Sequence, residues 1–278
     1  SKLSAVIYDH TSRQLKHYKT KDFEDASAIS GGTLYSDSRV KYADYTPISY
    51  PYTVVFDSFY KTSTTGFIPR WIPINSYRLS LQKGFLSVKN PIAIEWRHKN
   101  LNFENFKVDF NKTDTEITAS IKDVKAIGFE RSSVSFDQIF PETLIALNKS
   151  YLKGTYGEYK NWSEFGKWMN DELLEGRNEL SEATVLKVKE LIQGVDNDIE
   201  KAKILYKYMQ DKTRYISVQV GIGGWEPIPA KEVDKVGYGD CKGLSNYMKA
   251  LLDVAGVKSH YTIVYAQNKR NIDKDFTS

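Results

Sequence analysis

Apolar residues recur with a helical period after Asp240 and Cys241, near the end of the chain. Positions three, four, seven, eight and eleven residues beyond Leu244 are all apolar, and these positions form one face of a helix. The apolar face consists of Leu244, Tyr247, Met248, Leu251, Leu252 and Ala255. Gly256 follows, where a glycine often ends a helix. The pattern predicts a helix that begins at Cys241, with Asp240 as its N-cap.

The first half of the chain alternates apolar and polar residues instead, which is typical of half-buried strands. The candidate strands are 5–8, 52–56, 76–82, 92–97, 106–110 and 117–122. Asn111 to Asp114 supplies turn residues between the last two of these strands. Short strands separated by turns favour an antiparallel β-sandwich domain over residues 1–145.

Helical periodicity takes over after about residue 140. Pro141 and the stretch Lys153 to Gly157 favour a linker at 146–160. Asn197 with Glu200 resembles a capping box at a helix start. The helices and strands expected beyond the linker lie at 162–173, 185–192, 199–209, 215–220 and 261–265. Helices that pack on a small sheet would make residues 161–278 an α+β domain.

Composition excludes several classes of function. The net charge is only +4, and basic clusters such as 97–99 are too short for a nucleic-acid groove. No apolar run approaches the roughly 18 residues that span a bilayer. One cysteine and four scattered histidines give no metal-ligand spacing. The glycines at 221–224 are followed by prolines rather than by a phosphate-binding helix. We therefore expect no metal, no cofactor and no nucleic acid.

Aromatic residues are abundant in the first half. They could form a sugar-binding face, or they could simply fill a sandwich, as aromatics in strands usually do. The residues concerned are Tyr42, Tyr45, Tyr50, Tyr52, Trp71 and Tyr77. Packing is the favoured interpretation.

Cys241 is the only cysteine, and its place at a helix start has chemical consequences. Unpaired N–H groups and about half a positive charge at that end favour a thiolate, which is the nucleophilic form. Glycines close by leave room for a substrate backbone. A lone cysteine is nonetheless often an inert, buried core residue, so both interpretations stay open at this point.

The stretches that surround the cysteine are Arg214-Tyr215, Gly221 to Pro227, Pro229-Ala230, Val233 and Tyr238-Gly239-Asp240-Cys241-Lys242. Together they resemble the transglutaminase-like core, which belongs to the papain-type cysteine peptidase superfamily. The first half resembles, more diffusely, the β-sandwich domain of uncharacterised function that precedes such cores in many bacterial envelope proteins. The expected fold is thus a β-sandwich followed by an α+β, transglutaminase-like (papain-type) partial domain.

The resemblance implies a Cys-His-Asp triad in which Cys241 attacks an amide carbonyl and forms a thioester. A peptidase passes the acyl group to water, and a transglutaminase passes it to an amine. The backbone N–H of Cys241 is a candidate oxyanion donor. The residues expected to support the oxyanion or the substrate groove are Trp225, Tyr238, Gly239 and Asp240. For Trp225, burial in the core is as well supported by the sequence as a place in the substrate groove. For Asp240, the role of helix cap is better supported than that of an acid catalyst.

The family takes its base from a strand beyond residue 265 and its Asp from further on. We therefore expect a C-terminally truncated enzyme that is inactive alone. His260 is a tempting base, but the cysteine helix spans about 22 Å at 1.5 Å per residue. That length predicts an exposed His260 at the far end of the helix, out of reach of the thiol. His10, His17 and His98 lie outside the family's motif.

The resemblance also implies a periplasmic or cell-envelope location and a protein or peptide substrate, with cell-wall peptide or glycan as candidates. The alternative is a non-catalytic binding or scaffolding module for a glycan or a protein. The aromatic first half and the incomplete triad favour that alternative. The sequence leaves the substrate, the acyl acceptor and the oligomeric state open.

Overall fold

The computed structural model describes residues 1–28, 33–36, 38–264 and 272–278. By its internal contacts the chain forms two compact units. The first contains residues 1–63 and 173–261, and the second contains residues 64–172 and 262–278. The predicted boundary at 145 lies inside the second unit, and the strands before residue 63 share a unit with the cysteine helix.

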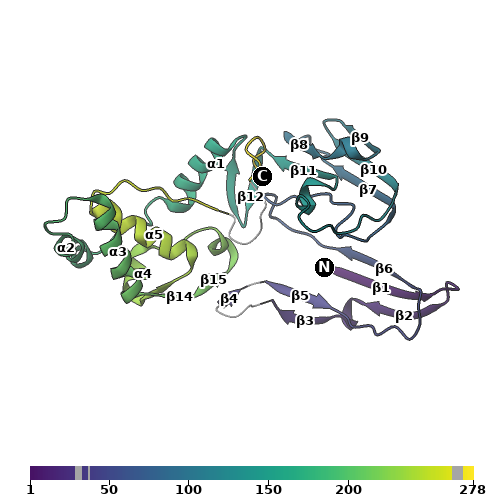
Figure 1. Ribbon diagram of the computed structural model, residues 1–278, viewed down its shortest axis with the longest axis horizontal. Coiled ribbons are helices and arrows are strands. Elements are labelled where there is room, and N and C mark those ends of the chain that lie inside the picture. The colour runs from purple at the N-terminus through teal and green to yellow at the C-terminus, as the bar shows by residue number, and fades with distance from the viewer. Residues whose placement is uncertain (29–32, 37, 265–271) are drawn as a thin grey trace. The chain divides into compact units, whose positions relative to one another are not determined.

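The amino-terminal part of the first unit is an antiparallel sheet in the order β2-β1-β6 (Figure 1). Its strands are β1 (Lys2–Asp9), β2 (Gln14–Lys19) and β6 (Tyr52–Phe59). The β1–β6 ladder runs in register from Lys2 opposite Phe59 to Asp9 opposite Tyr52. Period-two alternation buries Ala5 and Ile7. The strands predicted at 5–8 and 52–56 are therefore confirmed.

Two further pairs of short strands complete the β structure of this part. β3 (Glu24–Ser27) pairs antiparallel with β5 (Arg39–Tyr42). β4 (Thr33–Ser36) pairs in parallel with β15 (Ser217–Gln219), which belongs to the second half of the sequence. The amino-terminal segment is thus joined by backbone pairing to the region that contains the cysteine.

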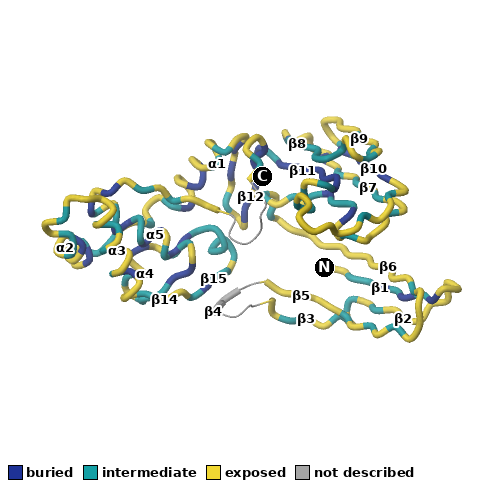
Figure 2. Tube along the Cα trace, in the orientation of Figure 1, coloured by how far each residue is buried: buried dark blue, intermediate teal, exposed yellow. Residues whose placement is uncertain are grey.

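The helical part of the first unit packs around one hydrophobic core. Its helices are α2 (Glu182–Leu191), α3 (Asp198–Lys212), α4 (Ala230–Val236) and α5 (Cys241–Val254). Buried residues from all four helices meet in that core, among them Val188, Leu205, Val233 and Leu251. Buried and exposed stretches alternate along the helices in Figure 2, as amphipathic helices require.

Helix α5 ends as its sequence predicts. Gly256 has a positive φ of 71°, which costs glycine little because it has no Cβ. The N–H of Val257 donates to the Leu252 carbonyl at 2.9 Å, and the N–H of Gly256 donates to the Asp253 carbonyl at 3.2 Å. These two bonds form a Schellman motif, which satisfies carbonyls that the helix itself cannot pair.

The second unit is built on the antiparallel sheet β7-β10-β9 and the antiparallel pair β8–β11. The strands are β7 (Leu81–Lys89), β8 (Trp96–Leu101), β9 (Val108–Lys112), β10 (Glu116–Val124) and β11 (Glu142–Leu147). Trp96, Ile117 and Ile145 form one core cluster and so pack the pair onto the sheet. Strand β10 buries Ile117, Ala119 and Ile121 in alternation, as predicted.

The strands predicted at 76–82 and 92–97 begin later than expected, because a residue with positive φ lies near the start of each. Arg78 has φ 62° and Ala93 has φ 49°, and this left-handed conformation interrupts an extended chain. Strand β7 therefore starts at Leu81 and strand β8 at Trp96. The side chain of Asn90 also closes a turn, because it both donates to and accepts from the backbone of Ile94.

The predicted linker at 146–160 is a β-hairpin instead. β12 (Lys149–Leu152) pairs antiparallel with β13 (Thr155–Glu158). The connecting residues Lys153 and Gly154 have φ 50° and 100°, as the tight turns of two-residue hairpins require. Glycine and its neighbours therefore mark a hairpin turn here and not a flexible junction.

Three further differences from the predicted elements concern a helix length, a strand and an additional helix. α1 (Trp162–Met169) is shorter than the predicted stripe and continues as a π-helical turn over Asn170–Leu174. The strand predicted at 261–265 is wrong for residues 261–264, which have no regular structure, and Tyr265 lies outside the described residues. No helix was predicted at 230–236, where α4 lies.

Candidate active site

Asp240 and Cys241 open α5 as the sequence predicted. Asp240 has extended backbone angles (φ −83°, ψ −175°), and its Oδ1 accepts a 2.9 Å hydrogen bond from the N–H of Gly243. That bond pairs a first-turn N–H with no partner inside the helix, which is the role of an N-cap. The Cys241 side chain is exposed, so the interpretation of Cys241 as a buried core residue is wrong.

A short parallel ladder holds the two residues that precede the cap. β14 (Arg214–Tyr215) pairs with β16 (Tyr238–Gly239), with Arg214 opposite Tyr238 and Tyr215 opposite Gly239. Gly239 is buried, and a Cβ at that position would lie 3.3 Å from Cγ2 of Val233. A side chain at position 239 would be crowded by Val233 of α4, so a glycine allows β16 to pack closely against α4 just before the start of α5.

The carboxylate of Asp240 is almost fully buried, with 1% of the residue exposed. Its Oδ2 accepts a 3.3 Å hydrogen bond from Nε2 of Gln219 on β15, and it also forms an ion pair with Nζ of Lys242. Buried charges are normally paired in this way, because burial without a partner costs several kcal/mol. Gln219 and Lys242 are therefore parts of the site that sequence reasoning did not assign, although Lys242 adjoins the cysteine.

The glycine-rich passage before α4 forms a 3₁₀ turn over Gly221–Gly224, and Trp225 follows it with a half-buried ring. Arg177 holds the next residues. Its Nη1 donates to the Pro227 carbonyl at 3.2 Å, and its Nη2 forms an ion pair with the Glu226 carboxylate. The passage is thus tethered rather than loose, which keeps Trp225 in a fixed place.

Arg177 also joins this passage to two helices. Its carbonyl accepts hydrogen bonds of 2.7 Å from the N–H of Ala230, at the start of α4, and from Nδ2 of the buried Asn246 on α5. No local pattern in the sequence predicts this role, because Arg177 lies 49 and 69 residues before Glu226 and Asn246.

After α5 the chain turns back along the helix, as the yellow segment beyond α5 shows in Figure 1. Burial raises the pKa of Tyr261 to about 12, and negative charge on Cys241 and Asp240 adds to the rise. An electrostatic effect of this kind requires that the phenol lies close to the helix start. Tyr261 is therefore a third residue of the site that sequence reasoning missed.

This return corrects the geometric argument about His260. The Schellman motif extends to Val257. The four residues from Val257 to Tyr261 cover about 13 Å when extended, so Tyr261 lies well back along the helix. His260 is therefore not held at the far end of α5, as the helix length alone suggested. Its side chain is exposed, as predicted. Among the described residues, no hydrogen bond joins a histidine to Cys241.

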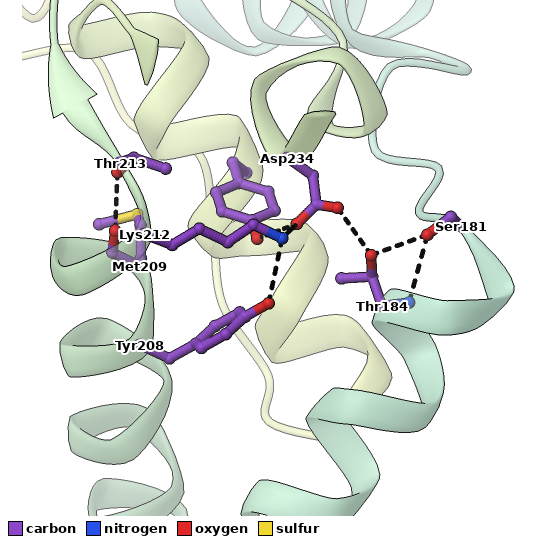
Figure 3. Close-up of polar contacts among 8 residues, drawn as sticks. Ser181, Thr184, Tyr208, Met209, Lys212, Thr213 and Asp234 are labelled. Carbon is purple, nitrogen blue, oxygen red and sulfur yellow. Dashed lines mark hydrogen bonds and ion pairs between the residues drawn. The ribbon is translucent and has the colours of Figure 1, made fainter. Parts of the chain in front are cut away.

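A second carboxylate, that of the half-buried Asp234, lies among the helices of the same unit (Figure 3). Asp234 on α4 accepts hydrogen bonds from Nζ of Lys212 on α3 at 2.5 Å, from Oγ1 of Thr184 on α2 at 2.7 Å, and from the hydroxyl of Tyr247 on α5. Nζ of Lys212 also donates to the Tyr208 hydroxyl at 3.2 Å. One carboxylate thus cross-links four helices.

The partners of Asp234 set its protonation. Burial alone would raise the pKa of this carboxyl, but the hydrogen bonds from Lys212, Tyr247 and Thr184 outweigh burial and hold the pKa below its ordinary value. Burial and the bond to Asp234 raise the pKa of Tyr247. Asp234 is therefore ionised at neutral pH and acts as a charged anchor between the helices. An ionised carboxylate has no proton to donate, so Asp234 is not suited to act as a general acid.

Two of the six aromatic residues of the possible sugar-binding face are packed against other side chains. Trp71 is buried and packs in the core of the second unit with Ala119 and Ile121, and Tyr77 contacts Phe140 edge-on. The four tyrosines Tyr42, Tyr45, Tyr50 and Tyr52 belong to the first unit. Packing, the favoured interpretation, holds for Trp71 and Tyr77.

Two other kinds of feature are absent from the part of the chain that the structure describes. No group of three or more His, Cys, Asp or Glu side chains there is arranged to hold a metal ion. In the same part of the chain, no helix is both long and apolar enough to cross a membrane.

The second unit contains a pocket of about 440 Å³ whose lining includes Arg70, Asn102, Trp162 and Phe276. The guanidinium of Arg70 lies 3.7 Å from the buried carboxylate of Glu142. Cys241 belongs to the other unit.

Comparison with known proteins gives a distant structural likeness. No protein-family model matches the sequence, and no curated protein matches it. The fold is similar to a crystal structure from Parabacteroides distasonis that is described as a putative protease, with a TM-score of 0.60 and 13% sequence identity. The match covers 92% of this chain and 48% of that one, so the chain spans about half the length of this neighbour. At this identity the likeness concerns the fold alone, which consists of β-sheets together with helices.

Proposed function

We propose that this protein is a cysteine enzyme of the transglutaminase-like, papain-type class, and that Cys241 is the nucleophile with which it acts on amide bonds. The single observation that carries the proposal is the exposed thiol on the first residue of α5, directly after a fully formed N-cap. The sequence motif around Cys241 and the fold shared with a neighbour described as a protease add support.

The helix start supplies the chemistry that a nucleophilic thiol needs. The partial positive charge of α5 favours the thiolate over the thiol. The N–H of Cys241 lies in the first turn, where backbone donors have no acceptor within the helix. A developing oxyanion placed beside the sulfur would meet that donor. The half-buried ring of Trp225, fixed by the tethered passage, is a candidate wall of the substrate groove.

The reaction proceeds in two steps. In the first, the Cys241 sulfur bonds to the amide carbonyl carbon, the C–N bond breaks, and the amine leaves with a proton supplied by a general acid. In the second, water or an amine attacks the thioester, loses a proton, and releases the thiolate. A peptidase results when water is the acceptor, and a transglutaminase when an amine is.

A base has to take part in both steps, and the resemblance to the family assigns it to a histidine beyond the cysteine helix. Among the described residues no histidine bonds to Cys241. We therefore expect residues 1–278 alone to form an acyl-enzyme with an activated ester, which needs no acid for its leaving group, but to turn over slowly or not at all.

The experiment is a burst assay with p-nitrophenyl acetate at pH 7.5. The account predicts a burst of about one equivalent of p-nitrophenolate per protein, followed by slow release, because the thioester forms and then persists. Cys241→Ser serves as the matched variant and should show no burst. A burst of equal size in that variant, or none in the native protein, contradicts the proposal.

We place the substrate class among proteins and peptides of the bacterial cell envelope, on the family resemblance alone. A non-catalytic module that binds a glycan or a protein is the competing proposal, and it predicts no Cys241-dependent burst. The exposed Tyr50, whose ring lies 5.5 Å from that of Tyr52, is the feature that would then deserve a binding assay with cell-wall glycan.

A further inference from the structure

Charged residues stand on both sides of the proposed nucleophile and bind to each other. Asp240 precedes Cys241, Lys242 follows it, and the two side chains form an ion pair across the first turn of α5. Only 2% of the Asp240 side chain and 12% of the Lys242 side chain are exposed. The exposed thiol therefore lies beside an ion pair that is largely shielded from water.

The carboxylate divides its oxygens between two tasks. Oδ1 accepts the capping bond from the N–H of Gly243, whereas Oδ2 faces Lys242 and Gln219. The capping bond orients the carboxylate and does not depend on the lysine. Oδ2, which makes no capping bond, is the oxygen that Lys242 neutralises.

Neither capping nor stability accounts for this pair. Asn and Ser cap helices about as well as Asp, so an uncharged residue would serve equally at position 240. Replacing a buried ion pair with uncharged residues of similar volume is often neutral for stability. A pair that flanks the thiol on both sides has a more specific consequence for the charge at Cys241.

That consequence is electrostatic. A lone Asp240 carboxylate would repel a thiolate on the next residue and so oppose the effect of the helix start, and burial would strengthen the repulsion. The ammonium of Lys242 cancels it. Of the groups on packed elements, Tyr261 has its pKa raised by burial to about 12 and is neutral at pH 7. Gln219 on β15 is uncharged.

Another charged pair involves the passage before α4. Glu226 in the passage before α4 is paired with Arg177, so the two contribute little net field at the thiol. Lys242 is the cation that directly opposes the Asp240 carboxylate among the described residues.

We propose that Lys242 is a positioning residue for the nucleophile: its ammonium holds and neutralises the Asp240 carboxylate, so that the start of α5 can stabilise the Cys241 thiolate. This inference rests on the proposed function, because it assumes that Cys241 is a nucleophile. Its test reads the thiol directly and does not require turnover.

The experiment measures the rate of carboxamidomethylation of Cys241 by iodoacetamide from pH 5 to 10, followed by intact mass. Lys242→Met removes the charge and the hydrogen bond, whereas Lys242→Gln removes the charge and keeps a donor. In both variants we expect the pH of half-maximal rate to rise by about one unit and the rate at pH 7 to fall about tenfold. Lys242→Arg keeps the charge and should stay close to the native profile.

A double variant separates charge balance from packing. Asp240→Asn/Lys242→Met removes both charges but keeps a capping oxygen, so the account predicts recovery to within about threefold of the native rate. Lys249→Met is the matched control, because Lys249 is also on α5 and is also ion-paired, with Asp253 at 2.7 Å. This control should keep the native profile.

A native profile in Lys242→Gln overturns the inference, as does a double variant that reacts as slowly as Lys242→Met. If Lys242→Met fails to fold, Lys242→Gln decides the question. A shifted profile without any acyl-enzyme would refute the proposed function and leave the inference standing. An acyl-enzyme together with an unshifted profile would refute the inference alone.

Discussion

Asp234 and Asp240 are two carboxylates in the same unit, each largely shielded from water and paired with a lysine, and their surroundings differ in one respect. Asp234 accepts hydrogen bonds from side chains on α2, α3 and α5, so its carboxylate joins these helices to α4. Asp240 receives a capping N–H, Gln219 and Lys242, and it adjoins an exposed thiol. The first carboxylate has only structural neighbours, and the second has a reactive one.

The comparison shows that shielding from water and an ion pair do not by themselves indicate a functional group. Both carboxylates have these two properties. What distinguishes Asp240 is that a solvent-exposed nucleophile follows it on the first residue of a helix. Substitutions at Asp234 should therefore change stability, and substitutions at the Asp240–Lys242 pair should change reactivity.

The largest expected effect on stability comes from Asp234→Ala. It leaves the fully buried Tyr247 hydroxyl without its acceptor and removes one of the two acceptors of the Lys212 ammonium. We expect the free energy of unfolding to fall by about 3 kcal/mol, because three hydrogen bonds are lost and a buried donor is left unpaired. Denaturant unfolding measures this change.

Asp211→Ala is the control for that substitution. Asp211 forms an ion pair with Lys207 on the surface of α3, so its loss should cost about 0.5 kcal/mol or less. Equal costs for Asp234→Ala and Asp211→Ala would show that the four-helix network does not stabilise the core.

The second prediction concerns acid. Because the pKa of Asp234 is lowered in the folded protein, its stabilising contribution is complete above the unfolded value of about 3.9. The contribution is lost as the pH falls through the lower, folded value. In Asp234→Asn the decline of unfolding free energy below about pH 4 should be shallower than in the native protein.

Unfolding titrations between pH 2 and 7 test this point. Some decline should remain in the variant, since a hydrogen bond from Thr11 holds the pKa of Asp9 at about 2. If the two proteins decline in parallel, Asp234 is not the charged anchor described above.

The smallest expected effect on stability lies at the other carboxylate. Asp240→Asn/Lys242→Met keeps a capping oxygen and removes both charges of the pair, so the unfolding free energy should change by about 1 kcal/mol or less. Thermal or denaturant unfolding of the double variant checks this. A loss as large as that of Asp234→Ala would make the Asp240–Lys242 pair structural, and the contrast between the two carboxylates would disappear.

The sequence predicts the parts of the site that depend on local pattern. Helix α5, its cap at Asp240 and its end at Gly256 all follow from a 3.6-residue period between a capping residue and a glycine. The same holds for the alternation in β10. Such features involve residues only a few positions apart.

Sequence reasoning misses features that depend on contacts far apart along the chain. Asp234 meets Thr184, 50 residues earlier, and Arg177 meets Asn246, 69 residues later, and no local pattern marks either pair. It also misses backbone exceptions such as Arg78 and Ala93, which carry positive φ without being glycine. The place of Tyr261 depends on the course of the chain after α5, which the helical period does not predict.

The central claim is that Cys241 forms an acyl-enzyme, and the most direct measurement is peptide mapping by mass spectrometry after reaction with p-nitrophenyl acetate. The account predicts one acetyl group on Cys241, released by neutral hydroxylamine as a thioester is, and no adduct in the matching peptide of Cys241→Ser. Acetylation confined to lysine or tyrosine side chains, with Cys241 unmodified, would contradict the claim.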